Sequence, residues 1–119
     1  MTPVALLPKV RSRALLDACA QMPCTLRIGT FIGIPCSGQN TVVGAHIGSM
    51  GKGMSTKVSD LSVVAACMTC HDLYDRRSPG GTRIREAYPS AFGERVLAAL
   101  QGTQARWVEM GLLTAKDQE

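Results

Sequence analysis

Four cysteines and two histidines are the residues of this chain whose types and spacing best suit chemistry. The cysteines form two pairs, Cys24 with Cys36 and Cys67 with Cys70, and the second pair has the Cys-x-x-Cys spacing. Zinc takes four ligands in a tetrahedral arrangement, and the ligands need not be close in sequence. The two pairs therefore predict one structural zinc ion held by all four thiolates.

Two other chemistries use the run Cys67-Met-Thr-Cys70-His71. Cys-x-x-Cys-His is the attachment sequence of c-type haem, and Cys-x-x-Cys is also the core of thioredoxin-like redox pairs. Haem attachment requires export, and the apolar run before Lys9 is too short for an export signal. The other cysteine pair competes with a simple redox role. Zinc is favoured, with redox and haem chemistry as alternatives. The fifth cysteine, Cys19, is expected to be a small buried hydrophobe.

The composition is typical of one globular domain: 119 residues, of which 45% are hydrophobic. No window approaches the roughly 18 apolar residues of a membrane span, so no membrane partner is expected. The expected compartment is the reducing cytoplasm, where paired cysteines are more often metal ligands than disulfides.

The net charge of +4 comes from basic residues in two groups. The first group lies in residues 1–57, where Asp17 is the one acidic residue, and consists of Lys9, Arg11, Arg13, Arg27, Lys52 and Lys57. The second follows the cysteine–histidine run and consists of Arg76, Arg77, Arg83 and Arg85. A phosphate backbone is a suitable partner for such a surface. The alternative is a solvated basic face that only raises solubility.

Hydrophobic periodicity and turn residues predict an α+β chain. The expected elements are a helix over 9–21, short strands over 25–28, 30–32 and 41–43, an apolar run over 60–67, a helix over 68–77, a turn at 78–81, and a long last helix. Ser90 is the expected N-cap of that last helix and Gly111 its stop. Trp107 continues its apolar stripe and is expected to pack in the core rather than stack on a base.

The two histidines are more informative together than separately. Alone, His46 at the end of a strand and His71 beside a metal knuckle are each more often structural. In combination, a strand ending in histidine, a glycine-rich loop, an Asp60-Leu61 step and Cys-x-x-Cys-His opening a helix predict a ββα arrangement. In that arrangement the two histidines converge.

At these residues the chain resembles the HNH, or His-Me finger, nucleases, and more narrowly the YbcO family of phage and prophage proteins. The likeness covers roughly residues 9–115 and rests on these runs: Cys24-Thr-Leu-Arg27-Ile28, Cys36, Ala45-His46-Ile47, Cys67-Met-Thr-Cys70-His71-Asp72, Asp75-Arg76-Arg77 and Gln104…Trp107…Gly111. It implies one HNH-like domain over 1–119, with an N-terminal helix in 1–22, a zinc-stapled ββα-metal core in 23–78 and a C-terminal helical region in 79–119.

The resemblance also implies a metal-dependent DNA endonuclease acting in the cytoplasm of a bacterial host. His46 corresponds to the general base, and His71 to a ligand of the catalytic Mg²⁺ or Mn²⁺. Asp75 lies four residues after His71, on the same helical face, and is a candidate second ligand. Lys52, Lys57, Arg76 and Arg77 are candidate phosphate contacts.

The sequence departs from the family pattern at two positions. Ala45 stands where many HNH enzymes have a metal-binding side chain, and Asp60 stands where they have asparagine. Asp60 would either orient His46 by accepting its N–H or bind metal itself. The alternative function is therefore a non-catalytic, zinc-stapled protein that binds nucleic acid or acts as an adaptor.

Overall fold

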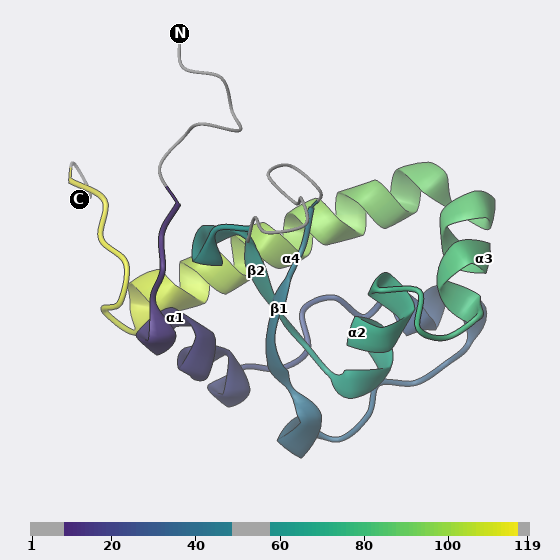
Figure 1. Ribbon diagram of the computed structural model, residues 1–119, viewed down its shortest axis with the longest axis horizontal. Helices are drawn as coiled ribbons and strands as arrows, with labels where there is room; N and C mark the ends of the chain where they lie inside the picture. The colour runs from purple at the N-terminus through teal and green to yellow at the C-terminus, as the bar shows by residue number, and fades with distance from the viewer. Residues whose placement is uncertain (1–8, 49–57, 117–119) are drawn as a thin grey trace, which may run out of the picture.

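The computed structural model describes residues 9–48 and 58–116 as an α+β arrangement of four α-helices and one two-stranded sheet (Figure 1). This agrees with the predicted fold class at that level. Lys52 and Lys57, two of the candidate phosphate contacts, lie outside the described residues. No helix in the described part of the chain is both long and apolar enough to cross a membrane.

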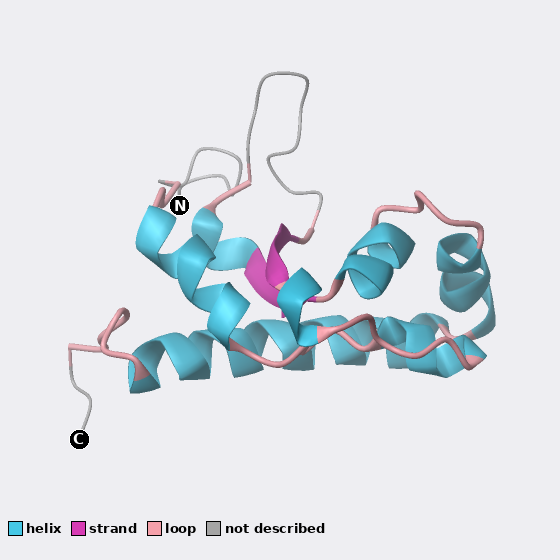
Figure 2. Cartoon of the chain, turned by 90° about the horizontal axis from the view of Figure 1, so that it is seen from below, coloured by secondary structure: helices cyan, strands magenta, loops and turns pink. Residues whose placement is uncertain are grey.

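The sheet is formed by β1 (Val43–His46) and β2 (Val63–Ala66), which pair antiparallel with His46 opposite Val63. Every residue of β2 is buried. The reason is that β2 pairs with β1 and packs against α4, while α1 packs against β1. Figure 2 shows the strands lying over the middle of the long helix α4. His46 thus ends a strand that is fixed by its neighbours along its whole length.

The helices are α1 (Arg13–Ala18), α2 (Met68–Tyr74), α3 (Gly80–Ala87) and α4 (Pro89–Glu109). The predicted first and second helices are present but shorter than expected, and a 3₁₀ turn over Cys19–Gln21 continues α1. The prediction of Ser90 as N-cap of the last helix is wrong. Pro89 already occupies the first turn, where its missing N–H costs nothing. Gly111 adopts a left-handed φ of 74° directly after the helix, as a C-terminal stop should.

Two predicted strands, over 25–28 and 30–32, are wrong. Ile28–Ile32 is a 3₁₀ helix that ends at Gly33, whose φ of 73° is left-handed. The helix α3 was not predicted, because Pro79, Gly80 and Gly81 are typical of a turn. Gly81 is needed there for close approach, since a Cβ would clash with the carbonyl oxygen of Leu73 in α2.

One hydrophobic cluster contains residues from both strands and all four helices, including Leu15, Val64, Leu73, Ile84 and Trp107. The Trp107 side chain is fully buried and its Nε1 donates to the carbonyl oxygen of Leu15 at 3.0 Å. Both the packing role of Trp107 and the burial of Cys19 are confirmed. The core therefore joins α4, near the end of the chain, directly to α1.

Candidate metal centre and histidine sites

The four predicted zinc ligands come together. Their sulfur atoms, from Cys24, Cys36, Cys67 and Cys70, all lie within 4.8 Å of one another, and no disulfide joins them. The Cys36 and Cys70 sulfurs are 3.9 Å apart. Around a zinc ion with Zn–S distances of about 2.3 Å, tetrahedral sulfurs lie about 3.8 Å apart. The quartet therefore fits a tetrahedral thiolate site for a metal ion such as zinc.

Three side chains hold the first turn of α2, which carries two of the cysteines. Cys67 is its N-cap, with its sulfur accepting from the Cys70 N–H at 3.4 Å. Ser37 Oγ accepts from the Thr69 N–H at 2.9 Å, and Thr41 Oγ1 accepts from the Met68 N–H at 3.1 Å. Ser37 follows Cys36 directly, so these contacts bring the first cysteine pair to the second.

The surroundings of the thiols favour ionisation of one and oppose that of others. Hydrogen bonding from Cys70 lowers the pKa of Cys24 to about 4. Burial, and then the negative charge of Cys24, raise the pKa of Cys36 to about 11. The same hydrogen bond and burial raise the pKa of Cys70. Four adjacent thiolates repel one another, so a bound cation is what would allow all four to lose their protons.

His46 forms a close pair with Asp60. Its Nε2 lies 2.8 Å from Asp60 Oδ1, and the imidazole is 37% exposed whereas the carboxylate is buried. With Asp60 ionised, Nε2 carries the proton and donates it to this hydrogen bond. In the neutral imidazole the other ring nitrogen, Nδ1, then has a free lone pair, and it has no hydrogen bond to any described residue. The pair therefore presents a proton acceptor at a partly open position.

The segment before α1 fixes the position of Asp60. The second carboxylate oxygen of Asp60, Oδ2, accepts from the Ser12 N–H at 2.7 Å. The backbone N–H of Asp60 donates to the Val10 carbonyl at 2.8 Å. Ser59 Oγ accepts from the Val10 N–H, and Gln104 of α4 donates to the Leu61 carbonyl. The sequence did not reveal these contacts, because they join residues more than forty positions apart.

The environment of Asp60 keeps it ionised. Burial alone raises the pKa of a carboxyl group. Here the hydrogen bonds from the Ser12 N–H and from His46, with the charge of Arg11, outweigh burial and lower the pKa below its usual range. With both oxygens already engaged, Asp60 is better suited to orienting His46 than to binding a metal ion.

His71 and Asp75 lie on one face of α2, as their spacing predicted, with His71 Nε2 3.2 Å from Asp75 Oδ2. Neither belongs to the cysteine cluster, the one group of three or more potential ligands found among the described residues. Arg77 Nη2 also donates to Asp75 Oδ2 at 2.7 Å, and its Nε lies 3.4 Å from Asp72 Oδ1. A cation at His71 and Asp75 would therefore compete with Arg77.

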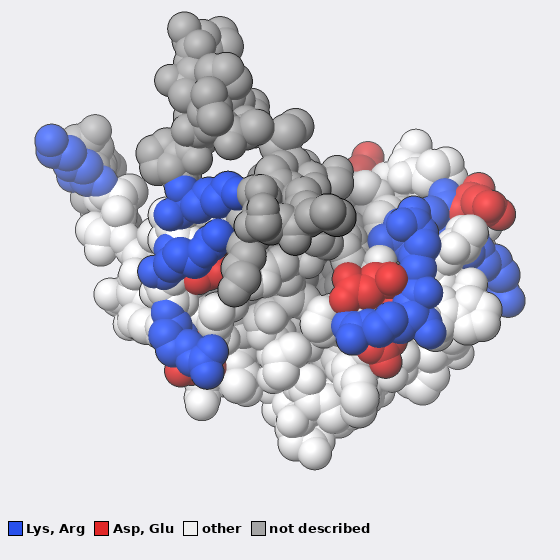
Figure 3. All heavy atoms as spheres, in the orientation of Figure 1, with Lys and Arg blue, Asp and Glu red and all other residues white. Residues whose placement is uncertain are grey.

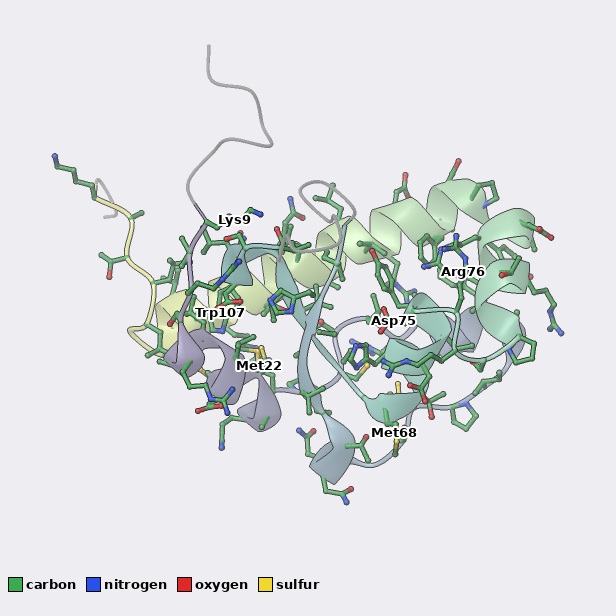
Figure 4. The ribbon with its side chains drawn as sticks, viewed as in Figure 1. Lys9, Met22, Met68, Asp75, Arg76 and Trp107 are labelled. Atoms are coloured by element: carbon green, nitrogen blue, oxygen red, sulfur yellow. The ribbon has the colours of Figure 1, made fainter. Side chains whose placement is uncertain are left out.

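One hydrogen bond links the His46 strand to the helix that carries His71. The Gly48 N–H, two residues after His46, donates to the Tyr74 hydroxyl at 2.8 Å, and Tyr74 lies three residues after His71. Figure 4 shows Asp75, the next residue, projecting from α2 toward the side of β1. The segment that follows β1 is thus joined directly to α2.

Two arginines of the second basic group, Arg85 and Arg76, have very different surroundings. The rings of Tyr74 and Phe92 stack with centroids 6.0 Å apart, and the Arg85 guanidinium lies against both, 5.0 and 4.5 Å from their centroids, while it donates to carbonyls at the end of α2. Burial, with the nearby charge of Arg76, lowers its pKa. Arg85 is thus a packing residue rather than a surface charge. Arg76 is exposed and has a left-handed φ of 58°, unusual for a side chain with a Cβ.

Basic side chains gather in two places on the face seen in Figure 3, one over α1 and the segment before it and one over α2 and α3. In the second place they are interspersed with acidic groups, in line with the pairing of Arg77 to Asp72 and Asp75.

Comparison of this chain with protein-family models, with curated proteins and with solved structures finds no match.

Proposed function

We propose that this protein is a metal-dependent DNA endonuclease of the HNH type, with zinc in the four-cysteine site holding the fold. The observation that carries the proposal is the His46–Asp60 pair, in which a buried carboxylate holds one imidazole nitrogen and leaves the other open. Supporting it, the chain order is antiparallel β1 and β2 followed at once by α2, which brings His71 and Asp75.

In this mechanism His46 Nδ1 takes a proton from a water molecule, whose oxygen attacks the phosphorus of a phosphodiester. Asp60 stabilises the positive imidazolium that results, and keeps its ring in the required orientation. The bond from phosphorus to the 3′ oxygen breaks. His71 and Asp75 are the residues that would hold Mg²⁺ or Mn²⁺, which supplies charge stabilisation to the phosphorane and the departing oxygen.

One observation favours a second candidate, a zinc-stapled nucleic-acid-binding or adaptor protein without catalysis. Arg77 already neutralises Asp75, and Ala45 is buried and offers no ligand. In the described residues the cation site thus consists of one imidazole, paired with Asp75, and the Asp75 carboxylate, which is shared with Arg77. A redox or haem role is less well supported, because both cysteines of the Cys-x-x-Cys run belong to the thiol quartet.

The experiment is cleavage of supercoiled, single-stranded, nicked and four-way-junction DNA with Mg²⁺ or Mn²⁺, with binding measured on the same DNA. An endonuclease cuts at least one of these forms. The adaptor instead binds DNA in a salt-sensitive way and cuts none of them.

A further inference from the structure

A pocket of about 450 Å³ lies between the segment after Cys24 and the middle of α4, and none of its lining residues belongs to the cysteine quartet or to the His46 and His71 sites. Its lining contains two arginines and no acidic side chain: Thr25, Arg27, Thr30, Arg95, Ala98 and Gly102. The volume is in the usual range for sites that hold small ligands or parts of larger ones. The pairing of two cations without a carboxylate indicates an anionic ligand.

Arg95 is held in place before any ligand arrives. Its Nη1 donates to the Arg27 carbonyl at 2.9 Å, and its guanidinium lies over the Phe31 ring, 4.9 Å from the centroid. These contacts use one of the five N–H donors of the group. The side chain is half-buried and has no ion pair with the described residues. An ordered guanidinium with spare donors loses little freedom when it binds an anion.

Arg27 is also unusual in its backbone. Its φ of 41° is left-handed, a conformation that side chains with a Cβ rarely adopt. Its carbonyl accepts from Thr30 Oγ1 at 2.7 Å and from Arg95, which holds this conformation. The exposed guanidinium makes no hydrogen bond or ion pair with residues 9–48 or 58–116. The Arg27 backbone also lowers the pKa of the nearby Cys24 thiol, so this conformation is tied to the cysteine cluster as well as to the pocket.

The hydroxyl groups of Thr25 and Thr30, which also line the pocket, have no proton left to donate to an anion. Thr25 Oγ1 donates to the Ala65 carbonyl and Thr30 Oγ1 to that of Arg27, so both hydroxyl protons are already used. The two arginines are therefore the side chains of this lining with N–H donors left for an anion.

Gly102 forms part of the pocket wall in the interior of α4. A Cβ at this position would meet nothing within 4 Å, so packing gives no reason for glycine. Glycine weakens a helix interior, yet here it leaves the space in front of Arg27 and Arg95 open.

We propose that this pocket binds a phosphate group of a nucleic-acid strand. The planar forks of two guanidiniums match the oxygens of a phosphate. The inference rests on the nucleic-acid part of the proposed function but not on catalysis, so it is tested by binding alone.

The experiment measures DNA binding by fluorescence anisotropy over a range of salt concentrations, in zinc-loaded protein that carries His46→Ala to prevent cutting. Arg27→Gln and Arg95→Gln are each expected to reduce the slope of log K against log salt by about 1. Gly102→Leu fills the pocket without removing charge and is expected to weaken binding about fivefold. This variant keeps the test valid if Arg95→Gln disturbs the fold.

The matched controls are Arg83→Gln, an exposed arginine of α3, and Gly93→Leu, a second glycine of α4 whose Cβ would also meet open space. Neither lines the pocket, and both are expected to behave as the parent protein. If Arg27→Gln and Gly102→Leu match these controls, the proposal is overturned.

Titration with inorganic phosphate, followed by ³¹P NMR, distinguishes a strand from a free anion. Phosphate binding that depends on Arg27, together with unchanged DNA slopes, overturns the strand as the ligand. Reduced slopes in the pocket variants support the proposal even if His46 proves irrelevant to cutting, so the two proposals can fail separately.

Discussion

Among single residues, Asp60 has the most demanding environment. A buried carboxylate is costly unless it is fully hydrogen-bonded. Here the Ser12 N–H takes one oxygen and His46 the other. Asp60 thereby joins the segment before α1 to the end of β1. A role in positioning His46 follows from this geometry, and a role as metal ligand does not.

The depressed pKa of Asp60 gives a prediction about acid stability. A carboxyl whose pKa is lowered by folding contributes stability above its unfolded value, about 3.9, and loses it as the pH falls through the lower folded value. Asp60→Asn is expected to reduce the free energy of unfolding by about 2 kcal/mol at neutral pH. Denaturant unfolding from pH 7 to 3 should show this difference shrinking below about pH 4. Asp17→Asn, at an exposed position, is the control. If the loss of unfolding free energy in Asp60→Asn did not change with pH, the lowered pKa assigned to Asp60 would be contradicted.

Trp107 carries a second residue-scale prediction. Its side chain is fully buried and hydrogen-bonded to Leu15. Trp107→Ala should lower the free energy of unfolding by about 3–5 kcal/mol. Leu97→Ala, on the same helix but 55% exposed, should stay within about 0.5 kcal/mol. Equal, small effects in urea unfolding would show that Trp107 is not the core residue described here.

At the scale of elements, the thiol quartet joins the segments around Cys24 and Cys36 to the start of α2. Because these segments contain little regular structure, their order would depend on a metal ion bound by the four thiolates. Chelation, or Cys36→Ser, is expected to collapse thermal stability, with one zinc per chain lost by elemental analysis. Cys19→Ala should leave the zinc content unchanged, since Cys19 lies outside the cluster. A chelated protein that melts at the same temperature would contradict a structural role for zinc.

The features that follow from cysteine spacing or from hydrophobic periodicity were predictable from the sequence. Cysteine spacing indicated the quartet, and periodicity indicated α4 with Trp107 in its apolar stripe. The two false strands had β-branched residues but no partner strand, and Gly33 allowed the chain to wind into a 3₁₀ turn instead. The helix α3 depends on Gly81 fitting against Leu73 in α2, a long-range contact that local turn residues conceal. The support of Asp60 by Ser12 was hidden for the same reason.

For the whole molecule, α4 is the element on which the other parts are assembled. It packs under the sheet, its Trp107 holds α1, its Gln104 holds the Asp60 segment, and its Arg95 holds Arg27. The proposed catalytic pair and the proposed phosphate pocket are thus attached to one rigid helix. Such a scaffold would keep both at fixed positions relative to a bound strand, and holding reactants in fixed geometry is one source of rate acceleration.

The most direct test of the central claim is the DNA cleavage rate of a double-mutant cycle at His46 and Asp60, measured with Mg²⁺ or Mn²⁺ on zinc-loaded proteins. His46→Ala is expected to slow cutting by about 10²–10⁴-fold, while the loss of the partner of Asp60 Oδ1 lowers the free energy of unfolding by about 1–3 kcal/mol and leaves the protein folded. Asp60→Asn should slow it less. Because Asp60 acts through His46, the double variant should be no slower than His46→Ala alone. Cutting by His46→Ala at the wild-type rate, or no cutting by the wild-type protein on any DNA form, would contradict the claim.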